Sequence, residues 1–180
     1  LVIDGKKHVL HTIPSGIFRA DKINFIGNGV VIDPVTLLKE IRTIEKEGID
    51  VSKRLIIAKR ANIILPTHKI LDAASEASKG DSKIGSTLKG IGPTYMDKTG
   101  RNGLRMGDIL ETDFKVKYEL LKNKHLQLLQ IYDYNFDLKP MEEEWFAAIE
   151  ELKKYQQEES VYFINNLLKD GKRILAEGAQ

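Results

Sequence analysis

RLIIAKRANIILPTHKILDAASEASKG, residues 54–80, contains the clearest succession of strand and helix signals in this 180-residue chain. Its first part, Arg54–Ala58, is a short apolar run of the kind that forms a buried strand, and Ile63–Leu65 is a second apolar stretch. Pro66 suits the first position of a helix that continues to Lys79, and Gly80 suits its end. Strands followed closely by helices predict an α/β fold with a mostly parallel sheet and flanking helices.

The residues before this segment fit the same architecture. Asp33-Pro34 provides a helix N-cap followed by proline at the first helical position, and Gly48 ends the apolar periodicity. An Asp-Gly pair between two apolar runs near the N-terminus is a hairpin signal. We therefore expect, in order, a hairpin of Leu1–Ile3 and His8–Ile13, strands Lys22–Ile26 and Gly29–Ile32 around a tight turn, and a helix Pro34–Glu47.

The character of the chain changes after residue 108. Helical periodicity predicts three helices, Thr112–Tyr132, Pro140–Lys154 and Ser160–Asp170, and then a strand at Arg173–Ala176. Trp145, Tyr155 and Tyr162 are expected to pack among these helices. We divide the chain into an α/β portion (1–78), a glycine-rich basic loop (79–108), an all-helical insert (109–171) and a returning strand and turn of the α/β portion (172–180).

The loop Ile84–Asp108 differs most from the rest of the chain. Residues 78–108 contain seven of the fourteen glycines, together with six lysines and arginines against three aspartates. Glycine lets backbone N–H groups approach a ligand closely, and lysine and arginine supply charge that matches phosphate oxygens. A long loop of this composition within a compact domain predicts a site for a phosphate-bearing ligand.

The same segment does not match a nucleotide-triphosphate loop. GDSKIGST, residues 80–87, resembles the G-x-x-x-x-G-K-S/T pattern, but Ser86 replaces the required lysine and the segment follows a predicted helix instead of a strand. Gly85-Ser86-Thr87 could still bind one phosphate through N–H groups and hydroxyls. Lys98, Arg101 and Arg105 would share one face of a helix, which fits either a phosphate site or an ordinary solvated surface.

The composition argues against several kinds of protein. The absence of cysteine excludes disulfides and thiolate metal sites, which fits a cytoplasmic location, and the four histidines show no metal-ligand spacing. No apolar run is long enough for a membrane span. A net charge of +2 argues against a nucleic-acid-binding domain, although the basic cluster keeps that alternative open, as it does a non-catalytic phosphate-binding module. The chain starts within an apparent strand, so we expect it to be a piece of a longer protein.

GIGPTYMDKTGRNGLR, residues 90–105, fits the pattern G-I-G-P-x-Y-x-x-K-x-x-R-x-G-x-R. This long pattern resembles the signature of the adenylosuccinate synthetase family. The segments VLHTIPSGIF, IGNGVVIDP, KIGSTLKGIGP and EGAQ agree with the same family in the same order. The resemblance spans the chain and is weaker through residues 112–170.

The resemblance implies an enzyme that joins IMP to L-aspartate with GTP and Mg²⁺ in purine biosynthesis, works as a homodimer, and has a fold distantly similar to P-loop GTPases. It implies that Thr87 contacts the IMP 5′-phosphate, that Arg101 reaches the IMP phosphate of the partner subunit, and that Lys98 is an active-site residue. Gln180 would lie near the reacting oxygen of the base, and Arg105 would support the interface or the same phosphate. The catalytic aspartate and histidine, the GTP loop and the Mg²⁺ ligands would lie outside this chain, so we expect the chain alone to be inactive.

Overall fold

The structure is a computed structural model that describes residues 2–3, 5–82 and 85–178. Its strands are β1 (Val2–Ile3), β2 (Lys6–Lys7), β3 (Asn24–Ile26), β4 (Val31–Ile32), β5 (Leu55–Ala58), β6 (Asn62–Ile63) and β7 (Gln156–Glu158). Its α-helices are α1 (Pro34–Glu45), α2 (Pro66–Ser78), α3 (Ile91–Thr99), α4 (Phe114–Leu129), α5 (Lys139–Leu152) and α6 (Ser160–Lys169). Short 3₁₀ turns occupy Ser15–Phe18, Val51–Lys53, Gly80–Ser82 and Met106–Leu110.

The central strands are parallel, as the sequence predicted. They form a three-stranded sheet in the order β3-β5-β7 and a two-stranded pair of β4 with β6. Gly27–Val30 is a tight turn between β3 and β4, because the Val30 N–H donates to the Gly27 carbonyl at 3.3 Å. The α/β class with a mostly parallel sheet is therefore confirmed. Among the described strands, only β1 and β2 pair antiparallel.

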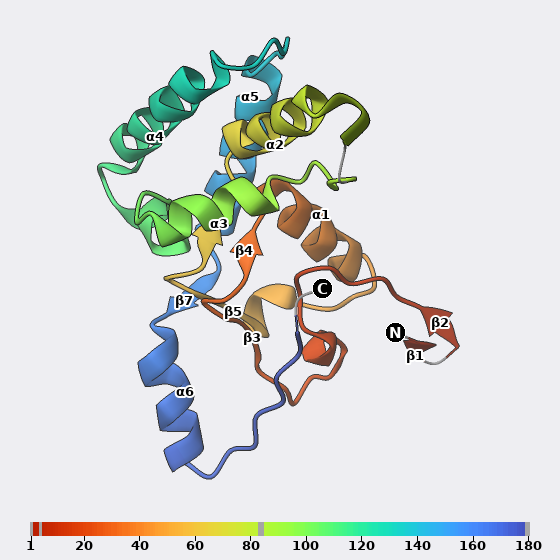
Figure 1. The fold of residues 1–180 in the computed structure, drawn as a ribbon. Helices are drawn as coiled ribbons and strands as arrows, with labels where there is room; N and C mark the ends of the chain where they lie inside the picture. Colours follow the sequence, from red (N-terminus) through yellow and green to blue (C-terminus); the bar gives the residue numbers. More distant parts are fainter. Residues whose placement is uncertain (1, 4, 83–84, 179–180) are drawn as a thin grey trace.

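Helices lie on both sides of these strands. In Figure 1, α2, α4 and α5 lie together above the strands and α6 lies below them. Helix α3 contacts α2 and also contacts β4 and β6. Helix α3 carries the signature sequence, so α2, β4 and β6 are the neighbours of that sequence.

The core joins the strands to α5 through aromatic packing. Trp145 of α5 is 1% exposed, and its indole N–H donates to the Ile64 carbonyl at 2.8 Å, just before α2 begins. Tyr118 and Phe114 of α4 pack against the same indole. Burial of a large aromatic side chain contributes several kcal/mol, about 3–5 kcal/mol by Trp→Ala substitutions elsewhere. The helical segment is therefore fixed to the base of α2.

Three predictions about strands were wrong. Arg173–Ala176 is exposed and forms no ladder with a described strand. Gln156–Glu158 instead forms β7 and pairs with β5, so the segment 109–171 is not all-helical. His8–Ile13 is not a strand either. The backbone N–H groups of His11, Thr12 and Ile13 donate to the Glu40 carboxylate at 2.8–3.2 Å, which leaves them no ladder partner.

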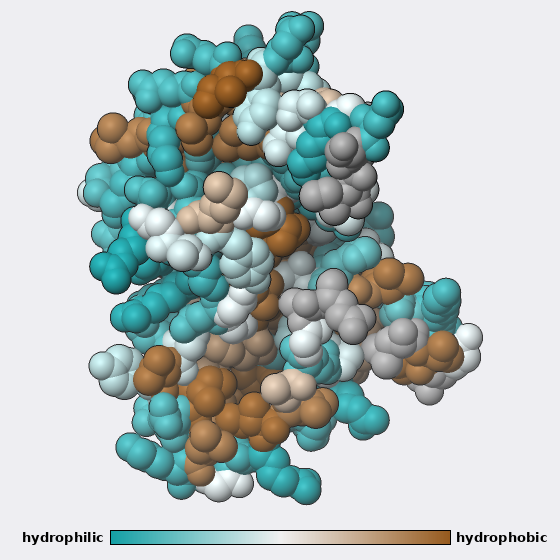
Figure 2. Space-filling view, in the orientation of Figure 1, coloured by the Kyte–Doolittle hydropathy of each residue, from teal (hydrophilic) through white to brown (hydrophobic). Residues whose placement is uncertain are grey.

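Helix α6 leaves an apolar surface in solvent. Figure 2 shows apolar atoms gathered over the lower part of the molecule, where α6 and the segment after it lie. Tyr162 is 73% exposed, in contrast to the predicted packing, whereas Trp145 and Tyr155 are buried as expected. None of the helices in the described ranges has the length and apolarity that crossing a membrane requires.

Candidate functional site

The glycine-rich segment starts where α2 ends. Helix α2 stops at Ser78, and Gly80–Ser82 forms a short 3₁₀ turn. Since the segment follows a helix, it lacks the strand–loop–helix setting of a nucleotide-triphosphate loop, as expected from the sequence. Residues 85–90 then lead into α3.

Gly90 sets the start of α3. Its φ of +76° lies in the left-handed region, which glycine adopts without strain. A Cβ on Gly90 would lie 2.9 Å from the His68 carbonyl carbon and from the Lys69 nitrogen, so only glycine allows α3 to begin this close to the α2 backbone. The Thr94 hydroxyl donates to the Gly90 carbonyl at 2.7 Å and secures the first turn.

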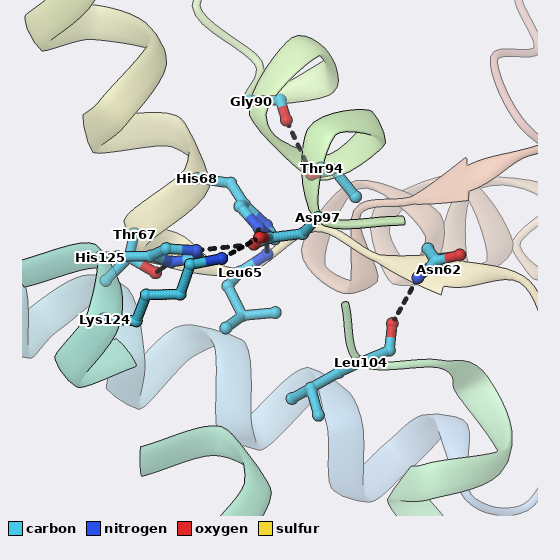
Figure 3. Close-up of polar contacts among 10 residues, drawn as sticks. All are labelled: Asn62, Leu65, Thr67, His68, Gly90, Thr94, Asp97, Leu104, Lys124 and His125. Atoms are coloured by element: carbon cyan, nitrogen blue, oxygen red, sulfur yellow. Dashed lines mark hydrogen bonds and ion pairs between the residues drawn. The ribbon is translucent and has the colours of Figure 1, made fainter. Parts of the chain in front are cut away.

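A buried polar cluster holds the middle of α3. The Asp97 carboxylate is 5% exposed and receives His68 Nε2 at 2.9 Å, His125 Nε2 at 2.7 Å and Lys124 Nζ at 2.7 Å. These side chains come from α2 and α4 and converge on Asp97 in Figure 3. Thr67 extends the cluster through a 2.7 Å hydrogen bond to His125 Nδ1. Three helices are therefore tied together at one carboxylate.

The hydrogen bonds fix the protonation of this cluster. The Leu65 N–H donates to His68 Nδ1 at 2.9 Å, so in neutral His68 the proton is on Nε2 and points at Asp97. Burial lowers the pKa of His68 despite the bond to Asp97. Burial opposes ionisation of Asp97, but the hydrogen bonds from His125, His68 and Lys124 outweigh it and hold the pKa of Asp97 below its usual range.

The same contacts argue against a metal ion at this cluster. One ligand atom from each of His68, Asp97 and His125 lies within 4.8 Å of the others, the only such group among the described residues. A metal would need His68 Nε2 without its proton, yet Nδ1 already accepts from the Leu65 N–H. The Lys124 ammonium also occupies the second oxygen of Asp97. The arrangement fits a hydrogen-bonded anchor better than a metal site.

Asp97 also shapes the turn after α3. Its carbonyl accepts the N–H groups of Asn102 at 2.9 Å and Gly103 at 3.2 Å. Just before them, Arg101 adopts a left-handed φ of +59°, which is uncommon for a residue with a side chain. The Arg101 side chain is exposed and forms no hydrogen bond or ion pair with another described residue. The turn therefore presents an exposed guanidinium to solvent.

Lys98 and Tyr95 face the turn between β3 and β4. Lys98 Nζ donates to the Asn28 carbonyl at 2.9 Å and lies 5.3 Å from the centre of the Tyr95 ring. The Tyr95 hydroxyl donates to the Gly29 carbonyl at 2.7 Å. Lys98 is thus held by neutral acceptors, and no carboxylate of a described residue pairs with it.

The other predicted site residues lie apart from this point. Thr87 is exposed in the segment before α3 and has no hydrogen bond to a described residue. Arg105 follows the turn after α3, and its N–H donates to Asp108 Oδ2 at 2.7 Å. Because α3 ends at Thr99, Lys98, Arg101 and Arg105 do not share one helix face. Gln180 lies outside the described residues.

The cluster at Asp97 is not apparent from sequence spacing. His68 lies 29 residues before Asp97 in the sequence, and His125 lies 28 residues after it. The three residues belong to three different helices, so no local motif joins them. One local signal was available. His68, Asp72 and Glu76 recur every four residues and therefore share one face of α2.

Comparison with known proteins identifies the family. The adenylosuccinate synthetase family model matches residues 1–180. Curated adenylosuccinate synthetases from Flavobacterium johnsoniae and Bacteroides fragilis are 60% and 53% identical over 182 and 180 residues. These alignments cover 100% of this chain but only 43% and 42% of the relatives, so the chain spans less than half of their length. The structure of a fully ligated adenylosuccinate synthetase from Plasmodium falciparum matches with a TM-score of 0.86 at 30% identity, over 99% of this chain and 42% of that one. The chain belongs to the adenylosuccinate synthetase family.

Proposed function

We propose that this chain supplies the IMP-binding half of a longer adenylosuccinate synthetase, a GTP-dependent ligase that joins IMP to L-aspartate. In this reaction GTP phosphorylates O6 of IMP, and the aspartate amine then displaces that phosphate to form the new C–N bond. The observation that carries the proposal is the family signature on α3, with Thr87 before the helix and the Arg101 guanidinium after it, both without a side-chain partner among the described residues.

Thr87 is proposed to hold the 5′-phosphate of IMP. Its hydroxyl and N–H are both donors, and neither is used by a described residue. A monophosphate is well held by such donors together with one arginine. The exposure of Thr87 supports this role, since a ligand can reach it without moving the core.

Arg101 is proposed to act on the IMP bound to the partner subunit of a homodimer. Thr87 precedes α3 and Arg101 follows it, and a helix of nine residues is about 13 Å long. The Arg101 guanidinium is exposed and has no partner among the described residues, which leaves it accessible to the site of a second subunit.

The remaining roles follow the family resemblance. Lys98 is proposed as an active-site lysine. Its ammonium donates to the Asn28 carbonyl, a neutral acceptor that does not neutralise the positive charge. Arg105 is proposed to support the interface or the same phosphate as Arg101. Gln180 is proposed to lie near the reacting oxygen of the base. Together these residues bind and orient IMP, and positioning is the main contribution that a protein makes to phosphoryl transfer.

GTP and Mg²⁺ are proposed to bind residues outside this chain. Mg²⁺ prefers an octahedron of oxygen ligands, whereas the one candidate metal cluster among the described residues contains two imidazoles and a neighbouring lysine. The catalytic aspartate and histidine are also proposed to lie elsewhere in the longer protein. We therefore expect no adenylosuccinate formation by the 180-residue chain alone. A cytoplasmic location is proposed from the nucleotide substrates.

Substitution in the full-length protein tests the IMP site. We expect Arg101→Leu to weaken IMP binding by about 1.5–3 kcal/mol, the usual contribution of a hydrogen bond to a charged group. Thr87→Ala should weaken it to a smaller extent. Arg42→Leu, at an exposed arginine of α1, is the control and should leave the affinity unchanged. Isothermal titration with IMP measures the effect, and an unchanged affinity in both site variants would refute the proposed site.

Mixed dimers test the role of the partner subunit. Arg101→Leu subunits combined with subunits that carry a defect in the upstream catalytic residues should recover part of the activity, because one of the two sites then has a complete set. Verified mixed dimers without any recovery would place Arg101 and its phosphate in the same subunit.

A further inference from the structure

One face of α2 is directed at the glycine-rich segment. His68, Asp72 and Glu76 are spaced by four residues and lie one above the other on that face. His68 binds Asp97 within α3, whereas Asp72 and Glu76 bind the residues that precede α3. A single row of side chains therefore contacts the segment from residue 85 to residue 97.

Glu76 binds the first part of this segment. One oxygen of its carboxylate accepts the Gly85 N–H at 2.6 Å and the Ser86 N–H at 3.2 Å, and the other accepts Lys79 Nζ at 2.9 Å. Glu76 is only 7% exposed. The hydrogen bonds from Lys79 and from Gly85 lower its pKa to about 2, so the carboxylate is charged at neutral pH.

Asp72 binds the second part, on either side of Thr87. One oxygen accepts the Ser86 hydroxyl at 2.7 Å and the other accepts the Gly90 N–H at 2.9 Å. The Ser86 hydroxyl oxygen in turn accepts the Leu88 N–H at 3.2 Å. Asp72 thus fixes both Ser86 and the start of α3, with Thr87 between them.

These contacts change the assignment of the Gly85-Ser86-Thr87 trio as a phosphate site. The N–H groups of Gly85 and Ser86 and the Ser86 hydroxyl already bind carboxylates. Of the three residues, Thr87 alone keeps its N–H and hydroxyl free of bonds to described residues. Of the three residues, only Thr87 therefore still has donors available for an anion. The residues on both sides of Thr87 are held by Asp72 and Glu76.

We propose that Asp72 and Glu76 are positioning residues that hold Thr87 ready for the phosphate of a nucleoside monophosphate. This inference rests on the proposed function of Thr87. Neither carboxylate is proposed to touch the ligand, since each of their oxygens already accepts a hydrogen bond from Gly85, Ser86, Gly90 or Lys79. Holding the segment in advance spares the ligand the entropic cost of ordering it.

The negative charge of Asp72 and Glu76 and their role in holding the segment predict opposite changes in phosphate affinity when the two residues are replaced. Two carboxylates near a bound phosphate repel it, so their replacement by amides would tighten binding if only charge mattered. Loss of the hydrogen bonds that hold the segment would weaken binding instead. The sign of the change in affinity therefore separates the two effects.

The test uses the full-length protein with Asp72→Asn, Glu76→Gln and the control Asp81→Asn. Asp81 is an exposed aspartate next to the same segment, without a hydrogen bond to a described residue, so its substitution removes charge alone. We expect the dissociation constant for IMP to rise about tenfold in Asp72→Asn and Glu76→Gln, the size of one charged hydrogen bond, and to stay constant or fall in Asp81→Asn. Amide exchange of Gly85, Ser86 and Gly90 in the free protein should accelerate in the first two variants.

A milder substitution keeps the test valid if Asp72→Asn or Glu76→Gln fails to fold. Ser86→Ala removes only the hydroxyl that Asp72 accepts, and we expect it to raise the IMP dissociation constant about threefold with unchanged thermal stability. Unchanged or tighter IMP binding in Glu76→Gln, Asp72→Asn and Ser86→Ala, with weaker binding in Thr87→Ala, would overturn the positioning role. An unaltered affinity in Thr87→Ala itself would instead overturn the proposed phosphate site.

Discussion

The substitution Asp97→Asn tests the anchor that joins α2, α3 and α4. The carboxylate accepts two imidazole N–H groups on one oxygen and the Lys124 ammonium on the other. An asparagine keeps one acceptor and replaces the other with an NH₂ donor. The amide nitrogen must then face either the two imidazoles or Lys124.

The structure favours the orientation in which this nitrogen faces Lys124. His68 cannot change its tautomer without losing the Leu65 N–H bond, and both imidazoles are buried. The Lys124 side chain is 42% exposed and can turn to water. The amide oxygen of the Asp97→Asn variant would therefore stay with His68 and His125.

The expected loss follows from the change in these bonds. A hydrogen bond to a charged acceptor contributes about 1.5–3 kcal/mol and a neutral one about 1 kcal/mol, so the two imidazole bonds lose about 2–3 kcal/mol in total. The pair with Lys124, whose side chain is 42% exposed and can turn to water, adds less than about 1 kcal/mol. Relief of the desolvation of the carboxylate offsets part of this loss. We expect the free energy of unfolding to fall by about 2 kcal/mol.

Equilibrium urea unfolding at neutral pH measures this change. Trp145 is the only tryptophan of the chain and is 1% exposed, so its fluorescence reports unfolding directly. The control is Asp113→Asn, since Asp113 is 57% exposed and pairs only with Lys117, at 3.1 Å, among the described residues. It should lose less than about 1 kcal/mol. An Asp97→Asn chain as stable as the wild type would refute the view that this carboxylate anchors α3.

Three further predictions concern stability, each measured by the same urea unfolding. Because the pKa values of His68 and Asp97 are lowered in the folded chain, the unfolded state binds more protons as the pH falls, and stability should decrease below about pH 6.5. The decrease should be smaller in His68→Gln, and an equal pH dependence would contradict the role of His68. Gly90→Ala should cost about 2–4 kcal/mol, from a left-handed φ and from overlap with the α2 backbone, whereas an unchanged midpoint would mean that α3 can shift. Glu40→Gln should cost about 1–2 kcal/mol, because three backbone N–H groups lose a charged acceptor, and a neutral result would show that water replaces it.

Local signals in the sequence predicted most helices and the central strands. Asp33 accepts the Val35 N–H at 3.3 Å and Pro34 opens α1, as an N-cap followed by proline predicts. The apolar run Leu55–Ala58 forms β5, buried on both faces. The signature pattern, which depends only on residue types and their spacing, also identified the family, and it lies on α3 and the residues around it.

Contacts between distant residues decided the rest. Gln156–Glu158 has no apolar pattern and is a strand only because it lies along β5, where the Lys59 N–H donates to the Glu158 carbonyl at 2.9 Å. Arg173–Ala176 has a strand-like sequence and yet is not a strand, because a strand forms only where the segment hydrogen-bonds to a neighbour, and these residues pair with no described strand.

The sequence by itself determined the family and the α/β class and predicted the segment proposed to carry the site, because these depend on local patterns of residue type. Only the tertiary structure decided how that segment is held. The four-residue spacing of His68, Asp72 and Glu76 becomes meaningful when α2 faces the glycine-rich segment, and Asp97 meets His125 only when α3 packs against α4. Burial then makes these few polar contacts strong, since a buried charge is tolerated only where its hydrogen bonds are satisfied.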